Sequence, residues 1–258
     1  DYIFHLAAQA LVRESYDNPK LTFETNTIGS LNILDCVRDF NHKCSIVMVT
    51  SDKCYENVEQ QKGYLEGDRL GGKDPYSASK AGAELVIKSY FNSFVSNMPN
   101  IRLAIARAGN VIGGGDWSDD RIIPDAIKAW SKGKMLKIRS PNATRPWQHV
   151  LEPISGYLCL AQSLDENNEI NGEAFNFGPK KSQNYTVEDV LLELKKHWNQ
   201  AKWSTENDKN FYESTLLSLN CNKAKKILGW EARLKFRENI RLTAEWYKRF
   251  YENEKISI

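Results

Sequence analysis

The chain has 258 residues, of which 41% are hydrophobic and 26% are charged, and 35 Lys and Arg against 33 Asp and Glu give a net charge of +2. This composition is typical of a folded globular protein and excludes collagen-like, low-complexity and intrinsically disordered classes. No basic stripe indicates binding to nucleic acid, and no apolar run reaches the about 18 residues of a membrane-spanning helix. A protein without nucleic-acid or membrane partners is therefore expected.

The cysteines and histidines indicate neither a disulfide framework nor a metal site. The five cysteines are odd in number and include no Cys-x-x-Cys pair, and the four histidines have no metal-ligand spacing. Free thiols fit a reducing compartment, so the protein is predicted to be cytoplasmic and to bind no metal.

The first 110 residues alternate between predicted strands and helices. Apolar runs predict strands at residues 2–8, 45–50 and 101–106. A helix should begin near Asn18, as N-cap, with Pro19 in its first turn, and a second should run from Pro75 to about Phe94. This alternation predicts an α/β fold with a Rossmann-like parallel sheet and crossover helices.

The second half of the chain predicts a smaller, mixed and mainly helical region. A glycine loop at residues 113–117 precedes predicted helices near 124–130 and 153–164, and a strand is expected at 174–177. Thr186 and Asp189 form a capping box for the next helix. Two more helices are expected at 223–228, where Gly229 would end the first, and at 237–251.

A tyrosine and a lysine four residues apart, Tyr76 and Lys80, open the helix that starts at Pro75. Side chains at this spacing share a helix face, and an ammonium group beside a phenol lowers its pKa toward that of a usable base. The preceding strand ends at Thr50-Ser-Asp-Lys53. Because ligands bind beyond the carboxyl ends of strands in open parallel sheets, the strand end and the helix start are expected to face one pocket.

Several segments, in the same order along the whole chain, resemble the extended short-chain dehydrogenase/reductase family of nucleotide-sugar enzymes. Within that family, residues 52–57, 109–117 and 145–153 are most similar to the CDP-glucose 4,6-dehydratases. The segments that carry the family resemblance are His5–Gln9, Thr25–Asn26, Gly29–Asn32, Thr50–Lys53, Tyr76–Lys80, Ala106–Asn110, Ile123–Pro124, Asn176–Gly178 and Leu228–Trp230.

The family's glycine-rich dinucleotide fingerprint would lie upstream of His5 and is absent here. At ~30 residues per strand–helix unit, roughly 80 residues are expected to be missing, so the sheet should lack its first βαβ units. The chain is therefore expected to be a fragment of a longer enzyme, and by itself to be inactive and to bind NAD too weakly to measure.

The resemblance implies an NAD-dependent lyase that converts CDP-glucose to CDP-4-keto-6-deoxyglucose and water, for deoxysugar and O-antigen-type lipopolysaccharide biosynthesis. It implies that Tyr76 takes the C4 hydroxyl proton, while Lys80 lowers the phenol pKa and holds the nicotinamide ribose. Asp52 matches the acid that protonates the C6 hydroxyl, and so needs a pKa raised by burial. Lys53 occupies the position of the C5 base, for which its pKa would have to fall. Ser51 matches a hydroxyl near the C4 oxygen.

The resemblance also implies binding roles and a division of the chain. Residues 1–112 and 150–179 would form the Rossmann-like dinucleotide-binding part, and residues 113–149 and 180–258 the nucleotide-sugar-binding part. A homodimer is expected. The loop under the cofactor would be Ala7, Ala8 and Gln9, and the substrate contacts would be Asn110, Arg145 and Arg121.

Other activities remain open at this level. A nucleotide-sugar 4-epimerase needs the Tyr76/Lys80 pair but not Asp52 and Lys53, so the latter two favour a dehydratase. The alternatives are such an epimerase, another nucleotide-hexose 4,6-dehydratase, and a noncatalytic nucleotide-sugar-binding relative.

Overall fold

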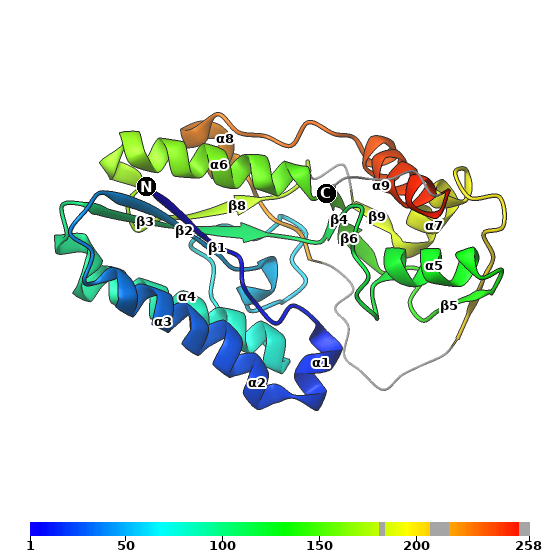
Figure 1. Cartoon of the computed structure of the whole chain (residues 1–258), viewed down its shortest axis with the longest axis horizontal. Helices are drawn as coiled ribbons and strands as arrows, with labels where there is room; N and C mark the ends of the chain where they lie inside the picture. The colour runs from blue at the N-terminus through cyan, green and yellow to red at the C-terminus, as the bar shows by residue number, and fades with distance from the viewer. Residues whose placement is uncertain (181–183, 207–216, 253–258) are drawn as a thin grey trace.

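A four-stranded parallel sheet forms the centre of the larger part of the molecule, in a computed structural model that describes residues 1–180, 184–206 and 217–252 (Figure 1). The strand order is β1-β2-β3-β8, and each neighbouring pair is parallel. The carboxyl ends of the strands therefore lie at one edge. The predicted Rossmann-like α/β fold is confirmed. The strands are β1 (Tyr2–His5), β2 (Cys44–Val49), β3 (Ile101–Ala108) and β8 (Ala174–Phe177).

Helices cover both faces of this sheet, as Figure 1 shows. On one face, α3 (Gly29–Val37) and α4 (Pro75–Ser93) pack against Ile46 and Met48 of β2. On the other face, α6 (Leu151–Glu166) and α8 (Asn222–Leu228) pack around Val47. Alternate residues of β2 thus enter two cores, which explains why its sequence is a continuous apolar run.

The helix after β1 begins earlier than predicted. The structure has α1 (Val12–Asp17), α2 (Pro19–Phe23) and a π-helical turn (Glu24–Ile28) that leads into α3. Pro19 does occupy the first turn of α2, but Asn18 gives no side-chain cap. Its Nδ2 donates instead to Oε1 of Glu14 at 2.6 Å, because Asn18 also ends α1 and its side chain meets the preceding turn.

The smaller region contains helices and short strand pairs around a separate core. Its helices are α5 (Ile122–Ser131), α7 (Val187–Lys195), which begins at the predicted Thr186/Asp189 capping box, and α9 (Phe236–Tyr251). These helices share one core with Trp130 and Trp147. The strand pairs are β4 (Val111–Ile112) with β7 (Gln148–His149), β5 (Leu136–Ile138) with β10 (Trp203–Thr205), and β6 (Thr144–Pro146) with β9 (Asn184–Thr186).

The predicted boundary between the two parts stays a prediction, but α8 packs with the sheet although residues 180–258 were assigned to the second part. Gly229 ends α8 with a φ of 67°, as its position predicts. Within the described residues, no helix has the length and apolar character to cross a membrane, and no group of three or more His, Cys, Asp or Glu is placed to hold a metal ion.

Candidate active site

A cavity of about 750 Å³ lies beyond the carboxyl ends of β1, β2 and β3. The sheet side of its wall comes from the segments that follow these strands and from the first turns of α4. The opposite wall comes from the start of α5, from β5 and from β6. The cavity therefore lies between the sheet and the smaller region, where the sequence predicted a pocket.

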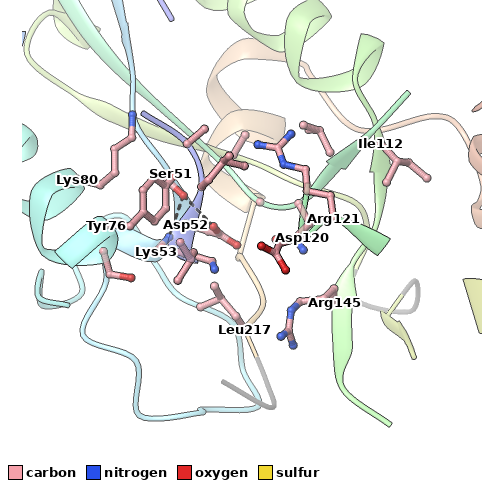
Figure 2. A pocket seen from close by; sticks show the side chains of 18 of the residues that line it. Ser51, Asp52, Lys53, Tyr76, Lys80, Ile112, Asp120, Arg121, Arg145 and Leu217 are labelled. Carbon is pink, nitrogen blue, oxygen red and sulfur yellow. Dashed lines mark hydrogen bonds between the residues drawn. The ribbon is translucent and has the colours of Figure 1, made fainter. Parts of the chain in front are cut away.

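The start of α4 brings Tyr76 and Lys80 into this cavity (Figure 2). Asp74 caps the helix, since its Oδ1 accepts from the Ser77 backbone N–H at 2.9 Å and its Oδ2 from the Ser77 hydroxyl at 2.6 Å. Pro75 occupies the first turn, as predicted. The cap fixes where the helix begins, and so places the tyrosine at the strand ends.

Both members of the pair are buried, and burial shifts the pKa of each. Burial raises the pKa of Tyr76 to about 12, although a hydrogen bond with Ser51 acts to lower it. Burial also lowers the pKa of Lys80 to about 8. The net pKa of Tyr76 is therefore raised, because desolvation of the phenol outweighs the hydrogen bond and the nearby charges. That Lys80 lowers this pKa stays a prediction. Within the described chain the Lys80 ammonium group makes no hydrogen bond, so its donors can serve a ligand.

Asp52 has the properties that an acid at this site requires. It is 2% exposed, and burial raises its pKa to about 6, against the opposing effects of Lys53, Ser51 and Arg145. Its Oδ1 accepts from the Ser51 hydroxyl at 3.1 Å, whereas its buried Oδ2 has no hydrogen-bond partner in the described structure. A Cβ on Gly109 would lie 3.1 Å from Oδ2, so glycine keeps this space open. The expected raised pKa is confirmed.

Ser51 and Lys53 complete the group at the end of β2. Ser51 caps the short 3-10 helix Asp52–Cys54 by accepting from the Lys53 backbone N–H at 3.2 Å. The Lys53 Nζ lies 5.9 Å from the centre of the Tyr76 ring. The cap therefore directs an acidic, a basic and a hydroxyl side chain from consecutive positions toward the tyrosine.

Two arginines, Arg121 and Arg145, and Asn110 also line the cavity. Figure 2 shows Arg121 and Arg145 across from Asp52. Arg121 precedes α5 and pairs with Asp116 at 2.9 Å. Arg145 is buried in β6, where its guanidinium donates to the Thr144 carbonyl at 2.8 Å. Two guanidinium groups across the cavity from Asp52 suit an anionic group such as a diphosphate.

Comparison with known proteins identifies the family. The model of the GDP-mannose 4,6-dehydratase family matches residues 1–243. The chain is 40% identical to a CDP-glucose 4,6-dehydratase of Salmonella typhimurium, over all of this chain and 73% of that protein. The chain belongs to the GDP-mannose 4,6-dehydratase family. This result confirms the predicted membership of the extended short-chain dehydrogenase/reductase family of nucleotide-sugar enzymes.

Solved structures share the fold of this dehydratase-family chain at lower identity. A UDP-glucuronic acid 4-epimerase from Bacillus cereus, solved with UDP-glucuronic acid and NAD, has a TM-score of 0.85 at 20% identity, covering 97% of this chain and 76% of its own. A dTDP-glucose 4,6-dehydratase from Bacillus anthracis, solved with NAD, has a TM-score of 0.80 at 22% identity, covering 99% and 75%.

The loop after β1 places Ala8 against the cavity, whereas Ala7 and Gln9 are not among its described lining residues. The Gln9 side chain donates to the Thr22 hydroxyl at 2.8 Å, and its backbone N–H donates to Asn26 Oδ1 at 2.9 Å. Gln9 therefore anchors the loop to the helices beneath it. The cofactor-binding roles of these three residues stay predictions.

Sequence reasoning missed a buried polar network beneath the site. Glu84 of α4 and Arg107 of β3 form an ion pair that also contacts Thr50 and Tyr55. A glutamate within a helix and an arginine within a strand carry no local signal of pairing. Only the packing of α4 on the sheet brings these four residues together.

The acidic residues facing the arginines were also missed. Asp120 lines the cavity and pairs with Arg13 of α1 at 3.0 Å, while Asp116 holds Arg121. The sequence analysis assigned no role to either residue.

Proposed function

We propose that the protein is a CDP-glucose 4,6-dehydratase that uses NAD and forms CDP-4-keto-6-deoxyglucose and water. The observation that carries this proposal is the buried Asp52 carboxyl group, with a pKa raised to about 6 and one unpartnered oxygen, beside Lys53 and facing Tyr76. An acid and a base at this place are needed for elimination of water but not for epimerisation at C4. The 40% identity to a CDP-glucose 4,6-dehydratase supports the same choice.

The residues of this chain fit the nicotinamide end of NAD. Lys80 presents a buried ammonium group without a hydrogen-bond partner in the described chain, and the small side chain of Ala8 lets the backbone come close to a ligand. Tyr76 and Lys80 would hold the ribose there. When bound, NAD would accept a hydride from the sugar C4 and return it to C6.

The first role of the protein is to take the C4 hydroxyl proton. Tyr76 would receive it on the phenol oxygen, which must first be ionised. The Ser51 hydrogen bond lowers the pKa of Tyr76 against the effect of burial, and the Lys80 charge would stabilise the phenolate. The resulting C4 ketone makes the C5 hydrogen acidic.

The second role is elimination across C5 and C6. Lys53, in its neutral form, would take the C5 proton, and Asp52 would give its proton to the C6 hydroxyl. The C5–H and C6–O bonds break, a C5–C6 double bond forms, and the oxygen leaves as water. Protonated Lys53 would give the proton back to C5 when C6 receives its hydride. A pKa of about 6 leaves a fraction of Asp52 protonated near neutrality, ready to donate.

The opposite wall would bind the nucleotide diphosphate. Arg145 and Arg121 line the cavity with guanidinium groups suited to phosphate oxygens, and Asn110 would contact the sugar. The product would enter deoxysugar synthesis for an O-antigen-type lipopolysaccharide, in the cytoplasm.

A homodimer is also proposed. Phe23, Ile28 and Leu85 lie on the helices of one sheet face and are 40%, 46% and 60% exposed, an apolar surface that a second copy would cover. Sedimentation of the full-length protein would show a dimer, and a monomer at micromolar concentration would contradict this part.

The test is turnover by the protein expressed from its complete gene. Incubation with NAD and CDP-glucose should give a 4-keto-6-deoxy product that absorbs in alkali. Asp52→Asn should slow elimination by about 10²–10⁴ while oxidation at C4 survives, because only elimination uses the acid. Formation of CDP-galactose would show a 4-epimerase, and saturable CDP-glucose binding without turnover would show a noncatalytic relative.

A further inference from the structure

A fully buried ion pair lies directly beneath the candidate active site. The Arg107 guanidinium donates from Nε to Glu84 Oε1 at 2.8 Å and from its second terminal nitrogen to Glu84 Oε2 at 2.8 Å. The two side chains are 5% and 1% exposed. This two-pronged geometry fixes both the distance and the relative orientation of α4 and β3.

The pair also holds the segment that carries Asp52 and Lys53, from both of its ends. Thr50, immediately before Ser51, donates from its hydroxyl to Glu84 Oε1 at 2.5 Å. Tyr55, immediately after the short 3-10 helix, accepts from Arg107 at 2.7 Å. The segment between these two anchors is therefore tied to the ion pair rather than to solvent.

The tyrosine hydroxyl extends the network to the next strand. Tyr55 donates to Asn176 Oδ1 of β8 at 2.7 Å, and its ring lies 4.9 Å from the Arg107 guanidinium carbon. Tyr55 thus has all its polar contacts inside the protein and cannot move without breaking them.

Glu84 lies on the same face of α4 as the proposed catalytic residues. Tyr76, Lys80 and Glu84 are spaced by four residues, which aligns their side chains along one side of the helix. The ion pair therefore connects the helix that carries Tyr76 and Lys80 to the strand end that carries Asp52 and Lys53.

Stability alone does not account for such a pair. Replacing a buried ion pair with apolar residues of similar volume is often neutral or stabilising, because the charges lose their hydration on burial. Glu84 has a second effect within the site: its charge raises the pKa of Lys80 against the lowering by burial. The pair is thus placed to influence both the geometry and the charge of the pocket.

We propose that Glu84 and Arg107 are positioning residues that hold Asp52 and Lys53 in register with Tyr76 and Lys80, an inference that rests on the proposed function. Through Thr50 and Tyr55 they set the place of the acid and base, and Glu84, one turn further along the same face of α4, adds a negative charge near Lys80. Neither residue touches the substrate.

The experiment uses variants that loosen the anchors without unpairing a buried charge. Thr50→Val and Tyr55→Phe each remove one hydroxyl from the network, in the full-length enzyme with NAD and CDP-glucose. Each should lower kcat about tenfold with KM within about twofold, since a small misplacement of catalytic groups costs rate rather than binding. Ile87→Val is the control, because Ile87 is buried on the same helix but lies in the apolar core.

A second variant tests the charge directly. Glu84→Gln should lower the pKa of Lys80, measured by NMR of labelled lysine without substrate, and should move the alkaline limb of kcat to lower pH by the same amount. Arg107→Lys keeps the charge but not the two-pronged geometry, so it should lower kcat about as much as Thr50→Val and Tyr55→Phe do.

The outcomes separate this proposal from the proposed function. Wild-type kcat in Thr50→Val and Tyr55→Phe, or an equal loss in Ile87→Val at matched melting temperature, would overturn the positioning role. If the wild-type protein does not convert CDP-glucose, the proposed function fails. The Lys80 titration needs no turnover and tests the charge effect separately: a lower Lys80 pKa in Glu84→Gln supports that part of the proposal, and an unchanged pKa overturns it.

Discussion

Replacing Asp52 with asparagine should change how stability depends on pH. The pKa of this carboxyl group is raised from 3.8 to about 6, chiefly by burial. A group whose pKa is higher in the folded state contributes stability that is present below its unfolded pKa and is lost as pH rises through its folded pKa. Asp52 therefore destabilises the wild-type protein progressively between about pH 4 and about pH 6.

The size of the effect follows from the shift. At about 1.4 kcal/mol per pKa unit, a rise of about two units corresponds to up to about 3 kcal/mol of unfolding free energy at neutral pH. Asparagine cannot ionise, so the variant lacks this loss. The asparagine NH2 group would occupy the buried position of Oδ2, where it finds no hydrogen-bond acceptor. This lowers the unfolding free energy of the variant by about 1–3 kcal/mol, by the same amount at every pH. The pH dependence, rather than the stability at one pH, is thus the quantity to measure.

The assay is denaturant unfolding of wild type and Asp52→Asn from about pH 4 to about pH 8, reading the difference in unfolding free energy. This difference should move in favour of the variant by about 2–3 kcal/mol across the range, or several degrees in melting temperature. Asp116→Asn is the control. Although burial alone would raise the pKa of Asp116, its hydrogen bonds with Ser118 and Arg121 lower it overall. The stability that Asp116 contributes is therefore already present above its ordinary pKa of about 4, and the difference for this variant should stay nearly flat over the same range. A flat difference for Asp52→Asn would refute the burial argument.

Three further predictions concern the tyrosine, the lysine and the glycine loop. Tyr76→Phe should lower turnover about 10²–10⁴-fold with nearly unchanged nucleotide-sugar affinity by calorimetry, and wild-type turnover would remove Tyr76 from the mechanism. In wild type, kcat should decline above about pH 8, because Lys80, with a pKa of about 8, loses its charge there. A kcat that stays unchanged up to about pH 10 would contradict this role of Lys80. Gly114→Ala should lower the melting temperature by several degrees, because its Cβ would lie 2.1 Å from the Trp246 ring, whereas Gly67→Ala, with no atom within 4 Å, should not.

Local sequence signals were sufficient for the four strands of the parallel sheet and for the helix that carries Tyr76, but not for the short strands β4, β5, β6, β7, β9 and β10. The continuous apolar run of β2 indicates burial on both faces, and the structure places its alternate residues in two cores. Asp74 and Pro75 specify the start of α4 within one turn, and this fixes Tyr76 and Lys80 on one face. These signals act over a few residues, so they can be read without knowledge of the fold.

The same local reasoning failed where two elements compete for one residue. Asn18 has the side chain of an N-cap, but it ends α1 as well as beginning α2, and it bonds to Glu14 in the preceding turn. The sequence contains both partners. The bond of Asn18 to Glu14 goes with the break between α1 and α2, and both of these helices pack against α4.

The sequence by itself determined the order of the elements, the Tyr76/Lys80 pair and the Ser51-Asp52-Lys53 strand end, because spacing along a helix or strand is local. The tertiary structure alone decided the protonation of these groups, since burial raises the pKa of Asp52 and Tyr76 and lowers that of Lys80. It alone also joined Glu84 to Arg107, which lie 23 positions apart. Desolvation and charge pairing depend on which groups surround a side chain. For these residues, the surrounding groups are brought together only by the packing of α4 against the sheet.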